Sequence, residues 1–314
     1  MRASAILPDA PAVRARATEP RPDWPGKGLC GIMRNAGARS SSAVRGRTGY
    51  RSSPFFPVQV TRPLSCNLHI PVIEVSSRAG TIVTMLLCDF HIHTTYSDGS
   101  IPLERTVDIF GQAGFDAIAI TDHVVNGDNS IGKVTRALNL SVTGGNFDDY
   151  LSHVRSEAAR AWDKYGMLVI PGVEISKNYF SANRSAHILL LDIKEFVPAC
   201  MDYEDIFREA RRQDALTVAC HPHTTPNVTE KDTLYLWNNR ERYAKYIDAW
   251  EVANRDDVFN VVSLKRYPYI ANSDFHKAHH LYSWKTLLNC DKTVDDVKQC
   301  IRHNKGVAIT LFRN

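Results

Sequence analysis

Residues 89–99 read DFHIHTTYSDG and place two histidines and two aspartates at the end of a short apolar run. In an extended strand, residues two apart share a face, so His91 and His93 can direct their imidazoles at one point. Asp98 follows in a Ser-Asp-Gly turn, within reach of a neighbouring ion. Imidazole and carboxylate ligands together suit zinc, manganese or iron. An HxH pair alone is a weak signal, so the rest of the chain must decide whether a metal site exists.

Later apolar runs carry the same residue types at or near their ends. The further candidate ligands are His123 in TDH, Glu174 in GVEI, His187 in AHILLL, His221 in CHPH, and Asp274 and His276 in NSDFH. A lone histidine is more often a core or surface residue than a ligand. Six of the twelve histidines at such positions, interleaved with carboxylates, favour a metal cluster instead.

Short apolar runs alternate with helical patterns from Met85 onward. The runs predict strands at Leu86–His91, Phe115–Thr121, Met167–Ile175, Ala186–Asp192, Ala215–His221, Tyr246–Glu251 and Tyr267–Asp274. The patterns predict helices at Pro102–Ala113, Phe147–Tyr165, Tyr203–Gln213, Lys231–Ala244, Asp257–Lys265 and Val294–His303. This alternation indicates an α/β fold with parallel strands joined by crossovers. A closed barrel brings strand ends together on one face, whereas an open doubly wound sheet would spread nine ligands along an edge.

Residues 1–84 differ in composition from the rest of the chain. They carry 12 Lys/Arg against 4 Asp/Glu, which leaves 26 against 30 for residues 85–314. They show no sustained helical or strand period, so we expect an extension outside the folded domain 85–314. In order of preference, the extension comes from a start codon assigned upstream of Met85, is disordered, or is a targeting segment. A basic arm that binds nucleic acid is a further alternative.

The cysteine content and the length of the apolar runs bear on the cellular compartment of the protein. The seven cysteines are scattered, odd in number and without a CxxC pair, which predicts reduced thiols in a cytoplasmic protein. No run of eighteen apolar residues occurs, so no membrane span is expected. The oligomeric state is not predictable from these features.

The ordered series of motifs between Met85 and Gly306 resembles the polymerase and histidinol phosphatase (PHP) family of metal-dependent phosphoesterases. The resemblance implies a distorted seven-stranded, TIM-like (β/α)7 barrel holding two to three divalent ions (Zn, Mn or Fe). It implies three ligand groups: His91, His93, Glu174 and Asp274; Glu174, His187 and His221; and Asp98, His123 and His276. Glu174 would bridge the first two metals. No ligand position is missing, which favours an active enzyme.

The expected reaction is hydrolysis of a phosphoric ester by a hydroxide that two metals hold in line with phosphorus. Asp89 and Asp122 adjoin ligating histidines and could orient an imidazole, although ordinary strand-end hydrogen bonding fits them nearly as well. Asp122 could also act as a proton donor. Candidate substrate-binding residues beyond strand ends are Lys177, Arg184, His223 and Arg255. For each cation, a solvated charge on a loop is the preferred interpretation, and the role of His223 stays open.

The segment between His123 and Glu174 is long for a connection on the active face of a barrel. As a cover over the site, it would favour small substrates, and the acidic balance of residues 85–314 agrees. We therefore expect hydrolysis of a small phosphorylated metabolite or nucleotide, with neither long nucleic acid nor a membrane as partner. The alternatives are a 5'-3' exonuclease acting on short oligonucleotides, a metal-dependent amide hydrolase, and a non-catalytic metal-binding module.

Overall fold

A computed structural model describes residues 73–76, 82–128, 130–138, 140–222, 233–255, 257–258 and 266–313. His223, most of residues 1–84 and most of the predicted helix Asp257–Lys265 lie outside these ranges. Residues 257–258, at the start of that predicted helix, are instead a short strand. Among the described residues, no helix is long and apolar enough to cross a membrane.

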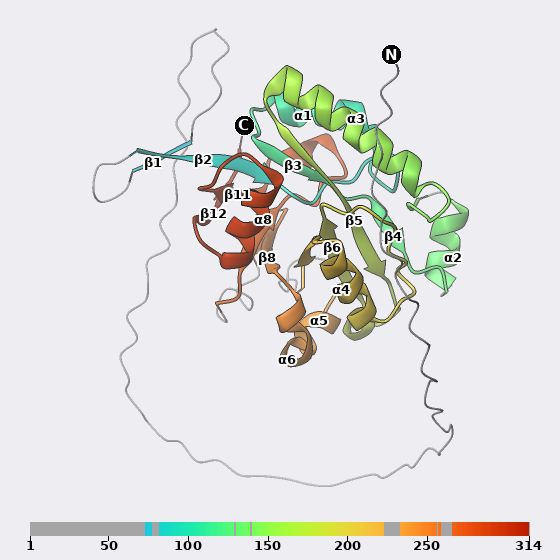
Figure 1. The fold of residues 1–314 in the computed structure, drawn as a ribbon. Coiled ribbons are helices and arrows are strands. Elements are labelled where there is room, and N and C mark those ends of the chain that lie inside the picture. The colour runs from blue at the N-terminus through green and yellow to red at the C-terminus, as the bar shows by residue number, and fades with distance from the viewer. Residues whose placement is uncertain are drawn as a thin grey trace, which may run out of the picture. The chain divides into compact units, whose positions relative to one another are not determined.

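One sheet forms the centre of the described chain (Figure 1). Its main path runs in the order β10-β8-β7-β6-β5-β3-β2-β11-β12, and β1, β4 and β9 pair with single strands beside it. The strands are β1 Ile73–Ser76, β2 Ile82–Asp89, β3 Ala117–Ile120, β4 His123–Val125, β5 Leu168–Lys177, β6 Ala186–Leu191, β7 Leu216–Ala219, β8 Ala249–Asn254, β9 Asp257–Val258, β10 Tyr269–Asn272, β11 Trp284–Leu288 and β12 Val307–Leu311.

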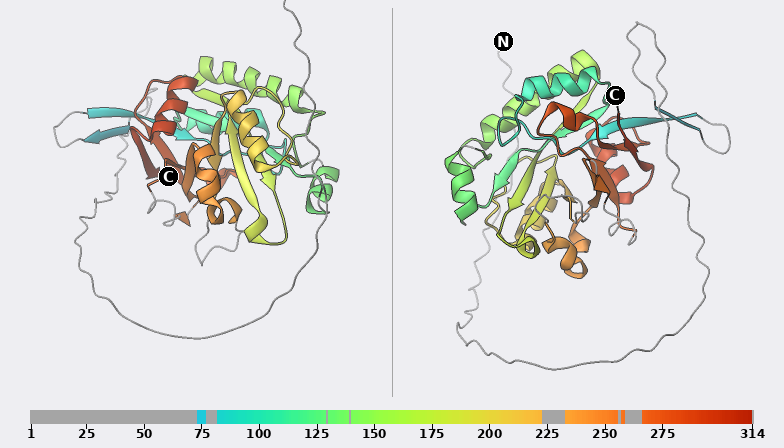
Figure 2. Two further views of the ribbon diagram at one scale, coloured as in Figure 1. Left: turned by 60° about the horizontal axis from the view of Figure 1, so that its bottom comes forward. Right: turned by 180° about the vertical axis from the view of Figure 1, so that it is seen from behind.

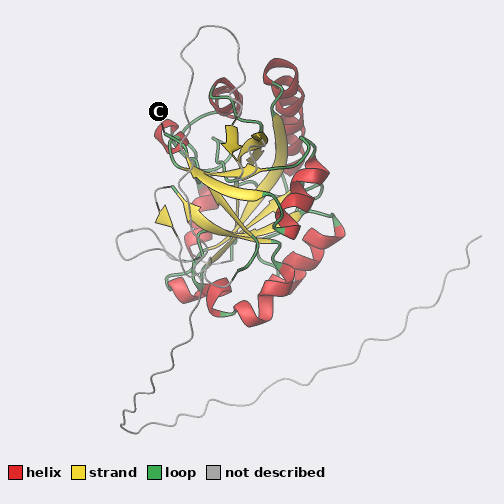
Figure 3. Ribbon diagram, turned by 90° about the vertical axis from the view of Figure 1, so that its left-hand side faces the viewer, coloured by secondary structure: helices red, strands yellow, loops and turns green. Residues whose placement is uncertain are grey.

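The seven predicted strands all exist and are sheet neighbours in chain order, from β2 through β3, β5, β6, β7 and β8 to β10. The segments that follow β2 and β10 meet in a parallel bridge between Ile92 and Phe275. The amide of His93 donates to the Phe275 carbonyl at 2.8 Å, and the Phe275 amide donates to the His91 carbonyl at 3.0 Å. These bonds nearly close the sheet into a barrel, with helices around the strands (Figure 3).

The predicted all-parallel (β/α)7 order differs from the structure in strand direction and number. β6 runs antiparallel to both β5 and β7, and β11 runs antiparallel to both β2 and β12. Only residues 178–185 separate β5 from β6, and this link is shorter than the crossover that parallel neighbours require. The main path therefore has nine strands rather than seven, and β11 and β12 are additions that the sequence patterns did not reveal.

The predicted helices match where an apolar face repeats over several turns. α3 Phe147–Tyr165 and α8 Val294–His303 have the predicted bounds. α1 Leu103–Gln112 is one residue shorter than predicted at each end, and α4 Tyr203–Arg212 is one residue shorter at its C-terminal end. The predicted helix Lys231–Ala244 is interrupted instead: its described part holds the short helices α5 Tyr235–Asn238 and α6 Arg240–Tyr243. α3 packs on the site-bearing strands, since the buried Tyr150 hydroxyl donates to the Gly172 carbonyl at 2.8 Å.

The first strand begins before Met85. β2 starts at Ile82, and its first residues pair with β1 in an antiparallel ribbon that projects from the sheet (Figure 2). Residues 86–88, by contrast, pair with β11. Part of the predicted extension 1–84 therefore forms strand structure, while the expectation for its remainder stays a prediction.

Candidate metal centre

The nine predicted ligands lie in or just beyond six strands, at one end of the barrel. His91 and His93 follow β2 and Asp98 lies in the turn beyond them; His123 begins β4, Glu174 lies in β5, His187 in β6, His221 after β7, and Asp274 and His276 after β10. Between the two histidines of the HxH pair, Ile92 is fully buried in the hydrophobic core. This alternation turns both imidazoles to the opposite side, toward the other ligands.

Glu174 lies at the centre of the group and is fully buried. Ring nitrogens of five histidines lie within 3.5 Å of its carboxylate oxygens: His187 at 2.8 Å, His123 at 2.7 Å, His91 and His93 at 3.4 Å, and His221 at 3.5 Å. Burial opposes ionisation of this group, but the charges of His187, His123 and His91 hold the pKa of Glu174 well below its usual range. The carboxylate is therefore ionised at neutral pH.

Asp274, which follows β10, lies close to two of these histidines, His91 and His93. Its Oδ1 lies 3.4 Å from His91 Nε2 and 3.2 Å from His93 Nε2. Its backbone φ is +48°, in the left-handed region that non-glycine residues seldom adopt. Such strain persists where surrounding contacts fix the residue, and it is common at functional sites.

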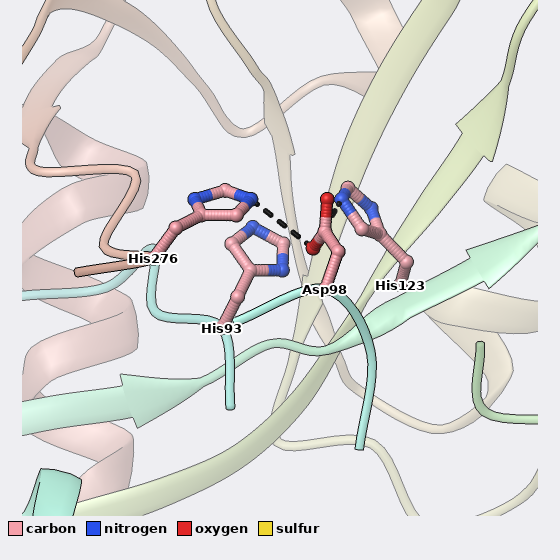
Figure 4. A group of neighbouring side chains, drawn as sticks. All are labelled: His93, Asp98, His123 and His276. Atoms are coloured by element: carbon pink, nitrogen blue, oxygen red, sulfur yellow. Dashed lines mark ion pairs between the residues drawn. The ribbon is translucent and has the colours of Figure 1, made fainter. Parts of the chain in front are cut away.

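Asp98 forms a second focus, shown in Figure 4. Its Oδ1 lies 3.4 Å from His123 Nε2 and 3.2 Å from His276 Nε2, with His93 between them. The candidate ligand atoms of His93, Asp98, His123 and His276 all lie within 4.8 Å of one another. His93 therefore lies in this group and also in the group of His91 and Asp274. The family resemblance had implied only the second of these positions for His93.

The chemistry of these side chains fits divalent cations. Several buried atoms have no hydrogen-bond partner among the described residues: His91 Nε2, both ring nitrogens of His93, both oxygens of Glu174, and His187 Nδ1. Buried polar atoms without partners are costly, and here they converge from different strands. Burial, with the neighbouring His276 and His123, lowers the pKa of His93 to about 3, so its ring is neutral at physiological pH, as a ligand must be.

The two predicted acid–base residues hold the backbone. Asp122 accepts hydrogen bonds from the Thr94 amide at 2.7 Å, the Thr94 hydroxyl at 2.8 Å and the Ser97 hydroxyl at 2.6 Å. Asp89 accepts from the Ser273 amide at 3.1 Å and pairs with a buried lysine, Lys285. Within the described chain, neither carboxylate hydrogen-bonds to an imidazole. Their contacts match the strand-end alternative rather than the orienting role.

Glu251 takes the orienting position that sequence reasoning missed. Its Oε1 lies 2.8 Å from His91 Nδ1, and both side chains are fully buried. A glutamate closing the apolar run YIDAWE is the signal that was available, because an unpaired carboxylate is costly at the end of a buried strand.

The predicted substrate-binding residues lie in different surroundings. The Lys177 amine donates to the Met201 carbonyl and lies 4.6 Å above the Tyr203 ring, and the exposed Arg184 lies 4.6 Å above Tyr179. Arg255 contacts a candidate ligand, because its guanidinium donates to Asp274 Oδ2 at 3.0 Å. Of the three that are described, only Arg255 hydrogen-bonds to a candidate ligand. His223 is outside the described residues.

The long segment between His123 and Glu174 contains the short strand β4, the helices α2 and α3, and the first part of β5. β4 pairs with β5 beside Glu174, and the segment continues into α2 Ser130–Ala137. It returns to the ligand, since the Val142 amide donates to the His123 carbonyl at 2.7 Å. Two apolar side chains near this helix, Val134 and Leu138, are mostly exposed.

Comparisons with known proteins identify the family of this chain. A curated relative from Eggerthella lenta, phosphoribosyl 1,2-cyclic phosphate 1,2-diphosphodiesterase, is 30% identical over 111 residues, which are 35% of this chain and 32% of that protein. The chain thus spans about a third of the length of that relative. A solved two-domain protein from Bacteroides vulgatus, described as containing a predicted PHP-like metal-dependent phosphoesterase, shares the fold with a TM-score of 0.53 and 23% identity. That match covers 73% of this chain and 66% of the other. The PHP domain family itself matches residues 89–262, more than half of the sequence, and the chain therefore belongs to the PHP domain family of metal-dependent phosphoesterases.

Proposed function

We propose that this protein hydrolyses the phosphoric ester of a small phosphorylated metabolite or nucleotide with a multinuclear metal centre. The observation that carries the proposal is the fully buried Glu174 carboxylate, which ring nitrogens of five histidines approach. One anion cannot satisfy so many imidazoles by hydrogen bonds. Divalent cations between them would satisfy both the carboxylate and the histidine lone pairs.

The nine residues would hold two to three ions. His91, His93, Glu174 and Asp274 would hold the first; Glu174, His187 and His221 the second; and Asp98, His123 and His276 the third, with His93 beside it. Bound divalent ions would activate water near neutral pH and neutralise charge on the phosphoryl group. The donor set suits zinc, manganese or iron.

The chain supplies positioning around this centre. Arg255 donates to Asp274 Oδ2 and would place a positive charge beside a phosphate bound at the centre. Asp122 fixes the loop that carries Asp98 through Thr94 and Ser97. Asp98 is the most exposed of the carboxylate ligands, with 44% of its side chain accessible, and would therefore lie nearest the entering substrate.

Two observations favour a small substrate. The charge balance of residues 85–314 is acidic, which disfavours a long polyanionic strand. The curated relative from Eggerthella lenta is named for a small cyclic phosphodiester of a phosphorylated ribose. The rival activity within the same chemistry is an exonuclease acting on short oligonucleotides.

A substrate panel on metal-reconstituted protein tests the proposal. The protein would be stripped with chelator, reloaded separately with zinc, manganese or iron, and assayed for phosphate and nucleoside release. Mononucleotides, sugar phosphates and a cyclic phosphodiester should be turned over, with rates that fall along an oligonucleotide length series. Rates that rise with chain length would favour the exonuclease. Metal binding without turnover of any ester would favour a binding module.

A further inference from the structure

Glu251 of β8 is a fully buried carboxylate surrounded by hydrogen-bond donors. Its Oε1 meets His91 Nδ1 at 2.8 Å and the Asn272 side-chain amide at 2.8 Å. Its Oε2 accepts from the His221 backbone amide at 2.7 Å and from the Asn254 side chain at 3.1 Å. The carboxylate therefore touches two candidate ligands, one through its ring and one through its backbone.

We propose that Glu251 is a positioning residue that fixes the tautomer of His91 and the backbone of His221, and so couples two of the metal positions. The inference rests on the metal binding in the proposed function. With the Nδ1 hydrogen donated to Glu251, the lone pair of His91 is on Nε2. That atom lies 3.4 Å from both Glu174 Oε1 and Asp274 Oδ1, on the side where an ion would bind.

The orientation of Asn272 shows that Glu251 must act as an acceptor. Asn272 Oδ1 accepts from the Phe90 amide at 2.8 Å, so its nitrogen is the atom that faces Glu251. The His221 amide is a donor in any tautomer. Each oxygen of Glu251 thus receives at least one fixed donor, and a side chain that presented an N–H at either oxygen position would oppose a donor.

His221 depends on this contact because its backbone is strained. Its φ is +25°, and the hydrogen bond to Glu251 Oε2 holds the amide in that conformation. The tautomer of the His221 ring is also fixed, with the hydrogen on Nδ1 as in His91. The Thr233 hydroxyl donates to the His221 carbonyl at 2.8 Å and so accepts from His221 Nδ1 at 3.1 Å. Nε2 is left facing Glu174.

The test compares Glu251→Gln, Glu251→Asp and the control Glu157→Gln. Glutamine keeps the length of the side chain but places a donor at one oxygen position. A donor at the Oε1 position faces the Nδ1 of His91 and the amide of Asn272, whereas a donor at the Oε2 position opposes the backbone amide of His221. Aspartate keeps two acceptors but is shorter. Glu157 on α3 is a similarly buried carboxylate, paired with Arg160 away from the cluster. Its variant reports the cost of losing a buried charge elsewhere in the fold.

Zinc affinity, measured by competition with a chromogenic chelator, should fall about 10- to 100-fold in Glu251→Gln, less in Glu251→Asp, and not in Glu157→Gln. The rise in Tm on adding zinc should shrink in the same order. Ring-nitrogen NMR of the zinc-loaded protein should show His91 protonated at Nδ1 in the wild type and in Glu251→Asp. A role in packing alone predicts the opposite order, because glutamine preserves shape better than aspartate.

Each result has a defined reading. Zinc affinity in Glu251→Gln equal to the wild type, or higher than in Glu251→Asp, would overturn the inference. If Glu251→Gln does not fold, the aspartate variant decides, and an unchanged affinity there would also overturn it. A wild-type protein that binds no zinc, manganese or iron would instead remove the proposed function on which the inference depends. Metal binding in the wild type without hydrolysis would leave the role of Glu251 intact.

Discussion

Lys285 and Asp89 form an ion pair at 3.1 Å in which both side chains are fully buried. Lys285 lies in β11 and also donates to the Ser283 hydroxyl at 2.8 Å. The second oxygen of Asp89, in β2, accepts from the amide of Ser273, one residue before the candidate ligand Asp274. The pair therefore links β2 and β11 to the segment after β10 that carries the candidate ligand Asp274.

Removing one partner should destabilise the protein strongly. Lys285→Met leaves Asp89 charged and buried without its cation, and we expect the free energy of unfolding to fall by about 3–5 kcal/mol. The double variant Lys285→Met/Asp89→Asn should recover part of this loss, because no buried charge remains. Urea unfolding of the single and double variants measures both effects. A double variant less stable than Lys285→Met would show that Asp89 acts mainly through Ser273.

Glu174→Gln should reduce the bound metal but leave the fold intact. The change removes a negative charge where two cations would meet, while the surrounding strands keep their apolar cores. We expect bound metal to drop by at least one ion per chain, and turnover to fall by more than about a hundredfold, the upper range for losing an outer-shell partner. Elemental analysis and circular dichroism provide the measurements. Retention of two or more metals with a near-normal rate would contradict the bridging assignment.

A chain beginning at Met85 should fold, bind metal and hydrolyse esters like the full chain. The residues of β2 before Met85 pair with β1, whereas the pairing with β11 starts at Leu86. The shortened chain should show the same Tm within a few degrees and the same metal content. Loss of folding would show that the β1–β2 ribbon, or residues before it, belong to the core.

Shortening the α2 segment should alter substrate size selectivity. Removing residues 128–139 keeps Ser141 and Val142, whose hydrogen bonds hold the His123 backbone, so metal content should not change. If the segment covers the site, cleavage of oligonucleotides should rise relative to mononucleotides, while a small chromogenic ester is hydrolysed as before. A constant ratio between the two classes would exclude a gating role. Loss of metal would mean that the segment supports a ligand.

Acid should weaken the contact between α1 and α3 in a defined pH range. Hydrogen bonds from Arg160 and Tyr165 lower the pKa of Asp108 from 3.8 to about 2. Because the folded pKa is depressed, its stabilisation is complete above the unfolded value and is lost as the pH falls through about 2. At neutral pH, the free energy of unfolding of the wild type should exceed that of Asp108→Asn by about 1 kcal/mol, a value reduced because the ion pair is partly exposed to solvent. Urea midpoints should converge toward pH 2, and a constant difference would exclude this ionisation as the cause.

The sequence predicted where strands and candidate ligands lie along the chain better than it predicted strand direction and side-chain contacts. Apolar runs located the seven strands from β2 to β10, and the residue types at their ends identified candidate ligands whose side chains the structure brings together. Strand direction was missed at β6, because a run such as AHILLL has the same pattern in either direction. β11 was missed because Lys285 interrupts its apolar run, and its burial depends on Asp89, 196 positions earlier in the chain. The roles given to Asp89 and Asp122 rested on their place beside histidines, and adjacency in sequence does not specify what a side chain contacts.

The antiparallel direction of β6 also affects how easily the connections at the ligand-bearing end of the barrel can change in length. In an all-parallel barrel, each connection on that face leads into a helix that must be repacked when the connection changes length. Residues 178–185 instead close a hairpin between β5 and β6, whose register is set by pairs from Gly172–Leu191 to Lys177–Ala186. The hairpin carries Glu174 and His187 on its two strands. One side of its turn is anchored, because the carbonyls of Ala182 and Ser185 accept from the amides of Leu234 and Tyr235 at the start of α5, whereas Phe180 at its tip is almost fully exposed. Insertions next to Phe180 are therefore a low-cost route by which evolution or design could extend the chain beside the candidate ligands.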